Sequence, residues 1–318
     1  MVAKRIKDPR GYFLLRDGVT QSMLADFIDC RQRMKYILDL WESGQSKMAL
    51  EFGSLWHYLL EQNYRAIREY GSKAPLPFMD VVKLYLDDIG GIPLAPEDWE
   101  QAEAMAEALY IPYWEYWIAD FKRKWIGVES KFDVKLFKRY RFRGMRDGLF
   151  QGRSRSRWLL ETKTTAWINE SALDDVLNFD FQNLSYVTAT EEETKKNVAG
   201  VLYNVIQKPG IKLGTKSNPD IPSWFKAIKA DIQKSPEKYF RRFEVKYSDI
   251  QKKAFRNELL DKLAEFEVWL KGDLPTYKNQ SACEKKKFTC EFVRACSSGG
   301  QMSEYQKTRE LMRELGGL

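Results

Sequence analysis

Apolar side chains recur at helical spacing along the first 124 residues of the chain. One stripe begins after Thr20 or Ser22, either of which can cap a helix; its members are Met23, Phe27, Tyr36 and Leu40. The same spacing predicts helices over residues 46–69, 79–88 and 97–124, the last with a kink at Pro112. The chain is therefore expected to open with a helical region.

The hydrophobic period changes to two from Trp125 onward. Residues 127–137, 140–150 and 158–165 are predicted to form three consecutive strands. The later elements are expected to be a helix over 172–190, a strand over 198–207, a helix over 223–234, an edge strand over 240–247, an amphipathic helix over 248–271 and a short terminal helix. This order, without internal repeats, predicts an α/β fold with one core and helical additions.

Composition limits the class of protein. The chain has 318 residues, of which 44% are hydrophobic, and this is enough for a sizeable core. No run approaches the roughly eighteen apolar residues of a membrane span, and the N-terminus lacks the apolar centre of a secretion signal. We therefore expect a soluble, cytoplasmic protein without a membrane partner.

The net charge of +7 is concentrated near three segments, 122–124, 138–146 and 153–157. Such basic clusters indicate a polyanionic partner, and nucleic acid is the natural candidate. The candidate phosphate contacts are Arg143, Arg146, Arg153, Arg155 and Arg157. The alternative is that these residues only solvate the strands of a hairpin.

The candidate chemistry begins with Asp147 and the segment Glu161-Thr162-Lys163. If residues 140–150 and 158–165 pair as a hairpin, both carboxylates lie at one end of the sheet. A period of two places Glu161 and Lys163 on the same face, with the carbonyl of Thr162 between them. Hard oxygen ligands of this kind suit Mg²⁺ or Mn²⁺, and a neighbouring lysine can serve a metal-bound water.

A solvated strand face is the more common explanation of a Glu-x-Lys segment. Here the apolar run 158–160 directly before Glu161 indicates a buried strand. Carboxylates at the end of a buried strand need a partner or a metal. This context favours the metal site.

Three residues on predicted helices extend the candidate site. His57, the single histidine, lies four positions after Gly53, whose missing side chain lets another segment or a ligand approach. Gln182 and Tyr186 are also four positions apart, so they point the same way. The alternatives are a satisfied core histidine, a core tyrosine and a surface glutamine.

The four cysteines are Cys30, Cys283, Cys290 and Cys296, the last three of them within one basic segment. Clustering in an intracellular chain favours a metal site over disulfides. Four thiolates suit either an iron-sulfur cluster or structural Zn²⁺. Such a site would bring Cys30 and the C-terminal segment together.

Taken in order, these motifs resemble the PD-(D/E)XK nuclease superfamily, and within it the RecB-type, AddB-like branch that carries an iron-sulfur cluster, with CRISPR-associated and phage exonucleases among its members. That branch has a helical Cys, Gly-x-x-x-His, a strand Asp, Glu-x-Lys, Gln-x-x-x-Tyr and three C-terminal Cys. The matching residues here are Cys30, Gly53 with His57, Asp147, Glu161 with Lys163, Gln182 with Tyr186, and Cys283, Cys290 and Cys296.

The resemblance implies a role for each of these residues in a restriction-endonuclease-like core, a mixed sheet flanked by helices. His57, Asp147, Glu161 and the carbonyl of Thr162 would bind Mg²⁺ or Mn²⁺, and Lys163 would position the attacking water. Gln182 and Tyr186 would order the catalytic site and contact DNA, and Glu129 matches a further family glutamate. The four cysteines would hold a 4Fe-4S cluster.

The chain departs from the family pattern in two places. Arg146 replaces the Pro before the strand Asp, which leaves the carboxylate in place. Cys283 and Cys290 are separated by six residues where the branch typically has two, so Zn²⁺ stays open as the alternative metal.

From the resemblance we expect a DNA exonuclease acting on single strands or duplex ends, in recombination, repair or viral DNA processing, with a recombination or replication protein as a further partner. Residues 1–124 would form a helical region contributing Cys30 and His57, residues 125–271 the nuclease core, and residues 272–318 a metal-bound latch. An inert nucleic-acid-binding scaffold is a different class that joint retention of the site residues disfavours. A structure-specific endonuclease would use the same chemistry.

Overall fold

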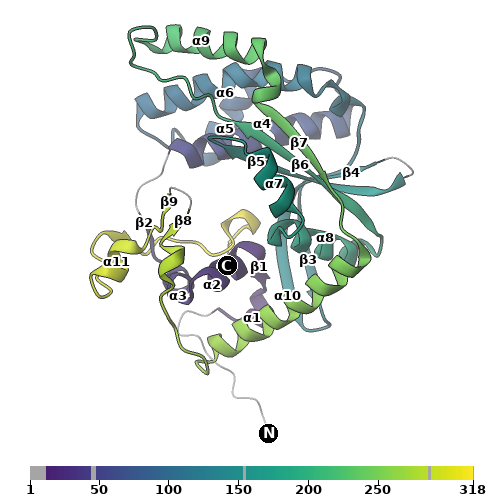
Figure 1. Cartoon of the computed structure of the whole chain (residues 1–318), viewed down its shortest axis with the longest axis vertical. Coiled ribbons are helices and arrows are strands. Elements are labelled where there is room, and N and C mark those ends of the chain that lie inside the picture. The colour runs from purple at the N-terminus through teal and green to yellow at the C-terminus, as the bar shows by residue number, and fades with distance from the viewer. Residues whose placement is uncertain (1–11, 44–47, 153–154, 286–287, 318) are drawn as a thin grey trace.

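A computed structural model of the protein describes residues 12–43, 48–152, 155–285 and 288–317. Within these residues, the centre is a six-stranded mixed sheet with helices on both faces (Figure 1). Its strands are β1 (Val19–Thr20), β3 (Lys124–Leu136), β4 (Tyr140–Gln151), β5 (Arg157–Thr165), β6 (Val198–Gln207) and β7 (Phe240–Val245). The expected α/β class with a mixed central sheet is confirmed.

Strand β4 organises the sheet because it has three partners. β3 pairs with it along one edge, antiparallel. Its other edge is shared: β1 pairs in parallel with residues 142–143, and β5 pairs antiparallel with residues 148–151. β6 follows parallel to β5, and β7 closes the edge antiparallel to β6. The predicted hairpin of β4 and β5 and the edge position of β7 are confirmed.

Two hydrophobic clusters separate the helices into two layers. One layer contains α4 (Met48–Tyr70), α5 (Phe78–Ile89), α6 (Pro96–Tyr116) and α9 (Ile221–Lys234), and the other contains α2 (Gln21–Asp29), α8 (Phe181–Thr194) and α10 (Asp249–Leu270) (Figure 1). Successive side chains of a strand point to opposite faces. Leu159 accordingly packs in the second layer and Leu160 in the first.

The single helix predicted after Thr20 is wrong, because the chain forms two helices there. Thr20 does cap the first, accepting a 3.2 Å hydrogen bond from the backbone N–H of Met23. That helix, α2, ends at Asp29, and α3 covers Arg31–Leu38. Cys30 between them has an extended backbone, with φ −162° and ψ 111°, which turns its side chain out of the helical path.

The helix predicted over residues 172–190 is also divided. α7 covers Glu170–Leu177, and α8 starts again at Phe181, where the side chain of Asp180 accepts a 2.7 Å hydrogen bond from the backbone N–H of Asn183. The helix predicted to reach residue 124 ends at Tyr116 and is followed by the 3₁₀ helix η1 (Ile118–Lys122). Side-chain caps and local turns, which periodicity does not register, explain these breaks.

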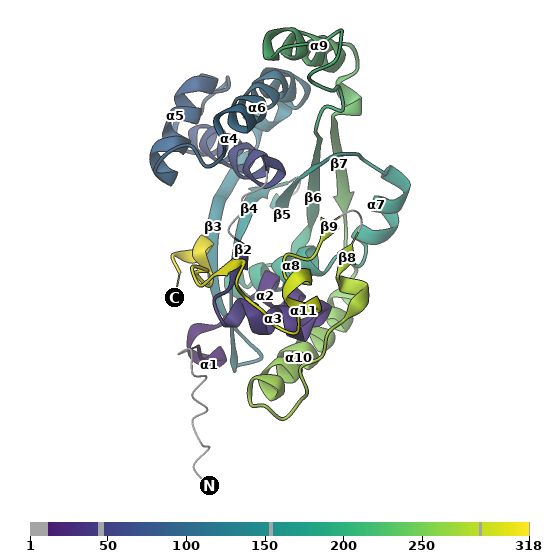
Figure 2. The ribbon, with the colours of Figure 1, turned by 90° about the vertical axis from the view of Figure 1, so that its left-hand side faces the viewer.

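The C-terminal segment lies against residues 29–43. It contains η4 (Gln280–Ala282), α11 (Val293–Ser297) and the short strand β10 (Tyr305–Gln306), which pairs with β2 (Glu42–Ser43). Figure 2 shows α11 beside α3. Among all the residues that the structure describes, no helix combines the length and the apolar character that crossing a membrane requires.

Candidate active site

Asp147 lies on β4 where the partner of that strand changes from β1 to β5. Its Oδ2 accepts a 2.6 Å hydrogen bond from the backbone N–H of Thr162, on β5. This bond fixes the carboxylate beside the Glu161-Thr162-Lys163 segment, as the predicted hairpin requires. The structure therefore brings the two sequence-predicted carboxylates to one place on the sheet.

His57 reaches the same place from α4. Its Nδ1 lies 3.6 Å from Oδ2 of Asp147 and 3.9 Å from Oε1 of Glu129. One ligand atom from each of these three residues lies within 4.8 Å of the others. A cluster of one imidazole and two carboxylates matches the donor set that Mg²⁺ and Mn²⁺ accept.

Glu129 has an unusual backbone for a strand residue. Its φ is +39°, in the left-handed region that side chains other than glycine rarely adopt. Val128 before it packs in the α4 layer, whereas Phe132 and Val134 after it pack in the α8 layer. The irregular residue thus marks where β3 changes the face it buries, and it directs a carboxylate toward His57.

Glu161 is the most enclosed of the candidate ligands, with a side chain only 3% exposed. Its Oε1 lies 2.6 Å from Nζ of Lys163. Its Oε2 is buried without a hydrogen-bond partner among the described residues. A buried carboxylate oxygen without a partner is costly, so this atom fits the position of a cation ligand.

The pKa values of the site residues also indicate a cation site. Burial and the nearby Asp147 raise the pKa of Glu161 to about 7, against the opposing charges of Lys163 and His57. Burial alone would lower the pKa of His57, but Asp147, Glu129 and Glu161 outweigh it and raise that pKa to about 9. The metal-free site therefore holds protons on Glu161 and His57, which a bound cation would displace.

Lys163 is held by two acceptors. Its Nζ donates a 2.9 Å hydrogen bond to Oε1 of Gln182, in addition to its contact with Glu161. Burial opposes the charged form, but Glu161 and Asp147 hold the pKa of Lys163 above its ordinary value. The ammonium is therefore a positively charged, oriented donor.

Tyr186 and Gln182 both reach the site from α8. Tyr186 lines the same cavity as His57 and Asp147, about 470 Å³ in volume, and its ring meets Phe132 edge-on at 5.5 Å. Their i, i+4 spacing predicted only that the two residues point the same way; their roles in the site stay a prediction. Glu61, one turn after His57, lines the cavity too and was missed; its spacing from His57 was the available signal.

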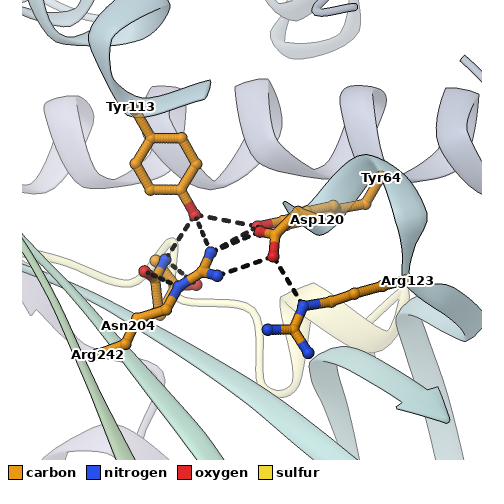
Figure 3. Close-up of polar contacts among 7 residues, drawn as sticks. Tyr64, Tyr113, Asp120, Arg123, Asn204 and Arg242 are labelled. Carbon is orange, nitrogen blue, oxygen red and sulfur yellow. Dashed lines mark hydrogen bonds and ion pairs between the residues drawn. The ribbon is translucent and has the colours of Figure 1, made fainter. Parts of the chain in front are cut away.

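A buried polar network that includes Tyr113, Asn204 and Arg242 (Figure 3) reaches Thr162 through Asn204. The side-chain amide of Asn204 donates to Oγ1 of Thr162 at 3.4 Å and to the hydroxyl of Tyr113 at 2.9 Å. Nε of Arg242 in turn donates to Oδ1 of Asn204 at 3.0 Å. Sequence reasoning missed these residues, although an asparagine inside the apolar run 198–207 was a usable sign.

The candidate DNA-binding arginines lie in different environments. Arg155 is exposed and Arg157 half-buried, on either side of the start of β5. Arg143 donates to the carbonyl oxygen of Asp17 at 3.2 Å and pairs with Asp133 at 3.5 Å. Arg153 lies outside the described residues.

Arg146 is enclosed, with a side chain only 4% exposed. It donates to Oγ of Ser130 at 3.0 Å and to Oγ1 of Thr190 at 2.9 Å, and it forms an ion pair with Glu193. All of its nitrogens thus serve contacts inside the protein. The guanidinium therefore has no free nitrogen to offer to a phosphate.

The four cysteines converge on one cavity of about 380 Å³. The break between α2 and α3 supplies Cys30, whose Sγ accepts a 3.4 Å hydrogen bond from the backbone N–H of Asn279. Cys283 follows η4, Cys290 follows β9 (Phe288–Thr289) and Cys296 lies on α11. Burial raises the pKa of the Cys290 and Cys296 thiols.

Comparisons with known proteins place these observations. A family model described as the PD-(D/E)XK nuclease superfamily matches residues 19–297, a range that contains every candidate ligand named above. No curated protein matches the chain in sequence. A solved "putative exonuclease" from Eubacterium rectale has 13% identity and a TM-score of 0.49, with 93% of this chain and 99% of that chain covered. The crystal structure of SSO0001 has 12% identity and a TM-score of 0.32, with 77% and 84% covered.

Proposed function

Because the chain belongs to the PD-(D/E)XK nuclease superfamily, we propose that it is a Mg²⁺- or Mn²⁺-dependent DNA exonuclease that uses the site around Asp147 and Glu161. The chain has the restriction-endonuclease-like fold of that superfamily, whose members hydrolyse nucleic acids. The finer assignment extends to the RecB-type branch and to a role in recombination, repair or viral DNA processing.

The observation that carries this proposal is the unpartnered Oε2 of Glu161, buried beside Asp147. His57, Asp147, Glu161 and the carbonyl of Thr162 would hold the metal, and the position of Glu129 supports it as a further ligand. A bound divalent ion supplies positive charge that polarises the phosphate and acidifies water.

Lys163 serves the attacking water in this proposal. Glu161 and Gln182 fix its ammonium, which remains charged and therefore orients the water by donating hydrogen bonds instead of removing its proton. The water oxygen attacks phosphorus and releases a proton to solvent, the bond to the leaving oxygen breaks, and that oxygen takes a proton from solvent. Tyr186 borders the space in which the phosphate would lie, and Gln182 contacts that space only through Lys163.

The test is incubation with DNA labelled at the 5′ or 3′ end, single-stranded and duplex, with Mg²⁺, Mn²⁺ or EDTA. Asp147→Ala and Lys163→Ala should abolish metal-dependent release of nucleotides while leaving DNA binding intact. Lys131→Ala, at an exposed position of β3, is the matched control. Cleavage of closed circular single strands would indicate an endonuclease, and wild-type rates in Asp147→Ala would refute the assignment.

We further propose that the four cysteines hold a 4Fe-4S cluster. Four thiols border one cavity of about 380 Å³, and four thiolates are the ligand set of such a cluster. Phe292, between Cys290 and Cys296 in the sequence, is fully buried and supplies the apolar surroundings that suit it. Structural Zn²⁺ takes the same four thiolates and is the alternative.

Purification without oxygen tests the cluster. The proposal predicts a brown protein with broad visible absorbance and about four irons per chain, as expected for a 4Fe-4S group. A colourless protein with stoichiometric zinc would contradict it.

A further inference from the structure

A second cavity, of about 610 Å³, lies beside the first turn of α4 and is bordered by Met48, Lys208 and Lys212. It adjoins the catalytic strand. The backbone N–H of Lys208 donates a 2.7 Å hydrogen bond to the carbonyl oxygen of Thr165, the last residue of β5. Lys163 is two residues before Thr165, a distance of roughly 7 Å along a strand.

The lining of this cavity has the opposite charge to that of the catalytic cavity. Glu61, Glu129 and Asp147 border the catalytic cavity, whereas two lysines and no carboxylate border the second. Among the residues that the structure covers, neither Lys208 nor Lys212 forms an ion pair with a carboxylate. The cavity therefore presents positive charge that the protein itself leaves uncompensated.

Lys208 has the surroundings of a ligand-binding residue and not those of a solvated surface lysine. Its side chain is half-buried, and its Nζ lies 5.7 Å from the centre of the Phe52 ring. Burial lowers its pKa, which means that its charged form lacks a nearby anion. An anion in the cavity would supply that partner.

The loop that carries Lys212 is held by several hydrogen bonds. Nε1 of the buried Trp224 donates to the carbonyl oxygen of Ile211 at 2.8 Å. The backbone N–H of Gly214 donates to the carbonyl oxygen of Asn218, also at 2.8 Å. A loop fixed in this way presents its lysine without a large ordering cost on binding.

We propose that this cavity binds a phosphate group of the DNA strand that the catalytic site hydrolyses, one to three nucleotides from the scissile bond. The inference rests on the proposed function, because it takes the scissile phosphate to lie at Lys163. Successive phosphates advance about 3.4 Å along a duplex axis, so a strand with its scissile phosphate at Lys163 has neighbouring phosphates within a few residue lengths of Thr165, to which the Lys208 backbone is hydrogen-bonded. The site would hold the substrate strand in register while the catalytic residues act.

The test compares Lys208→Gln/Lys212→Gln with Lys226→Gln/Lys229→Gln. The second pair lies on α9, is exposed and removes the same charge without bordering the cavity. Fluorescence anisotropy with a labelled single-stranded oligonucleotide in EDTA should show binding about tenfold weaker for the cavity pair only. The slope of log K against log salt should fall by about 0.7, since one phosphate contact with a single strand contributes about 0.7.

Two further measurements distinguish a failure of this proposal from a failure of the proposed nuclease function. Hydrolysis of bis(p-nitrophenyl) phosphate, which is too short to reach the cavity, should be unchanged in the cavity variant while kcat/KM on DNA falls. If wild-type protein hydrolyses neither substrate, the nuclease assignment fails and the binding result still decides the cavity. Equal weakening in the α9 pair, or equal competition by poly-glutamate and DNA, would overturn the proposal. Lys212→Gln alone, at an exposed position, gives the same test if the double variant does not fold.

Discussion

Arg242 on β7 and Asp120 in η1 form an ion pair inside the protein, with two nitrogen-to-oxygen distances of 2.8 and 2.6 Å (Figure 3). Their side chains are 5% and 1% exposed. Through Asn204, this pair connects the helical layer of α4 and α6 to Thr162 beside the candidate metal ligands. The stability of the fold and the position of the catalytic strand therefore share one set of contacts.

Replacing Arg242 by Met should lower the free energy of unfolding by about 3–5 kcal/mol, because Asp120 would remain as a buried charge with only Arg123 to compensate it. Denaturant unfolding measures this. The neighbouring Arg241 pairs with Glu170 at the surface, so Arg241→Met should cost only about 0–1 kcal/mol. Equal losses in both variants would mean that the buried pair has no special role.

Replacing Glu129 by Gln should weaken Mn²⁺ binding by roughly 10–100-fold, because the residue places a carboxylate next to His57 and Asp147. Calorimetric titration of Mn²⁺ into the protein measures this. Asp133→Asn, at an exposed position of the same strand, is the control and should bind Mn²⁺ as the wild type does. An unchanged affinity in Glu129→Gln would exclude this residue from the metal site.

The metal-free protein should lose stability as the pH rises from about 5 to 9. The pKa of Glu161 is raised to about 7, so the folded state binds a proton that the unfolded state releases at lower pH. The pKa of His57 is raised to about 9, so its contribution is complete below its ordinary value of 6.5 and disappears as pH passes 9. Thermal unfolding at several pH values, with and without Mn²⁺, should show a metal-induced rise in Tm that is larger at pH 9 than at pH 6.

Replacing Cys30 by Ser should remove the visible absorbance expected of a cluster and lower Tm, because this residue ties the α2–α3 break to the C-terminal segment. Lys163→Ala should keep both the absorbance and the Tm while losing hydrolysis. Visible spectra and thermal unfolding of the two variants separate the latch from the catalytic site. Retained absorbance in Cys30→Ser would remove this cysteine from the ligand set.

Much of the fold could be predicted because alternation and helical stripes are local properties of the chain. The strand over residues 198–207 was predicted to the residue, and the hairpin of β4 and β5 followed from a polar turn between two alternating segments. β1 was missed because a strand of two residues contains no period to detect. The break at Cys30 has no Gly or Pro to signal it, and contacts with Asn279 far along the chain accompany it.

The positions of the candidate site residues were easier to predict from the sequence than the surroundings of each side chain. The i, i+4 spacing of Gln182 and Tyr186 predicts that the two residues point the same way, and the structure places Gln182 against Lys163 and Tyr186 in the cavity of His57 and Asp147. For Arg146, the surrounding basic residues suggested a surface charge, whereas Thr190 and Glu193 from α8 enclose it. Ion pairs between segments distant in sequence are set by tertiary packing, and a charge cluster in one segment does not reveal them.

The pairing of β2 with β10 has a consequence for how the chain folds as it is made. Thr308 donates a hydrogen bond to Glu42, 266 positions earlier, and residues 19–20 pair with residues 142–143. Because a ribosome releases the amino-terminal part first, these early segments emerge long before their partners exist. Contacts between residues so far apart in the sequence slow folding. Until they form, apolar surface stays exposed to chaperones. Residues 19–20 and 42–43 are thus synthesised well before their partners and are among the last to complete their native contacts.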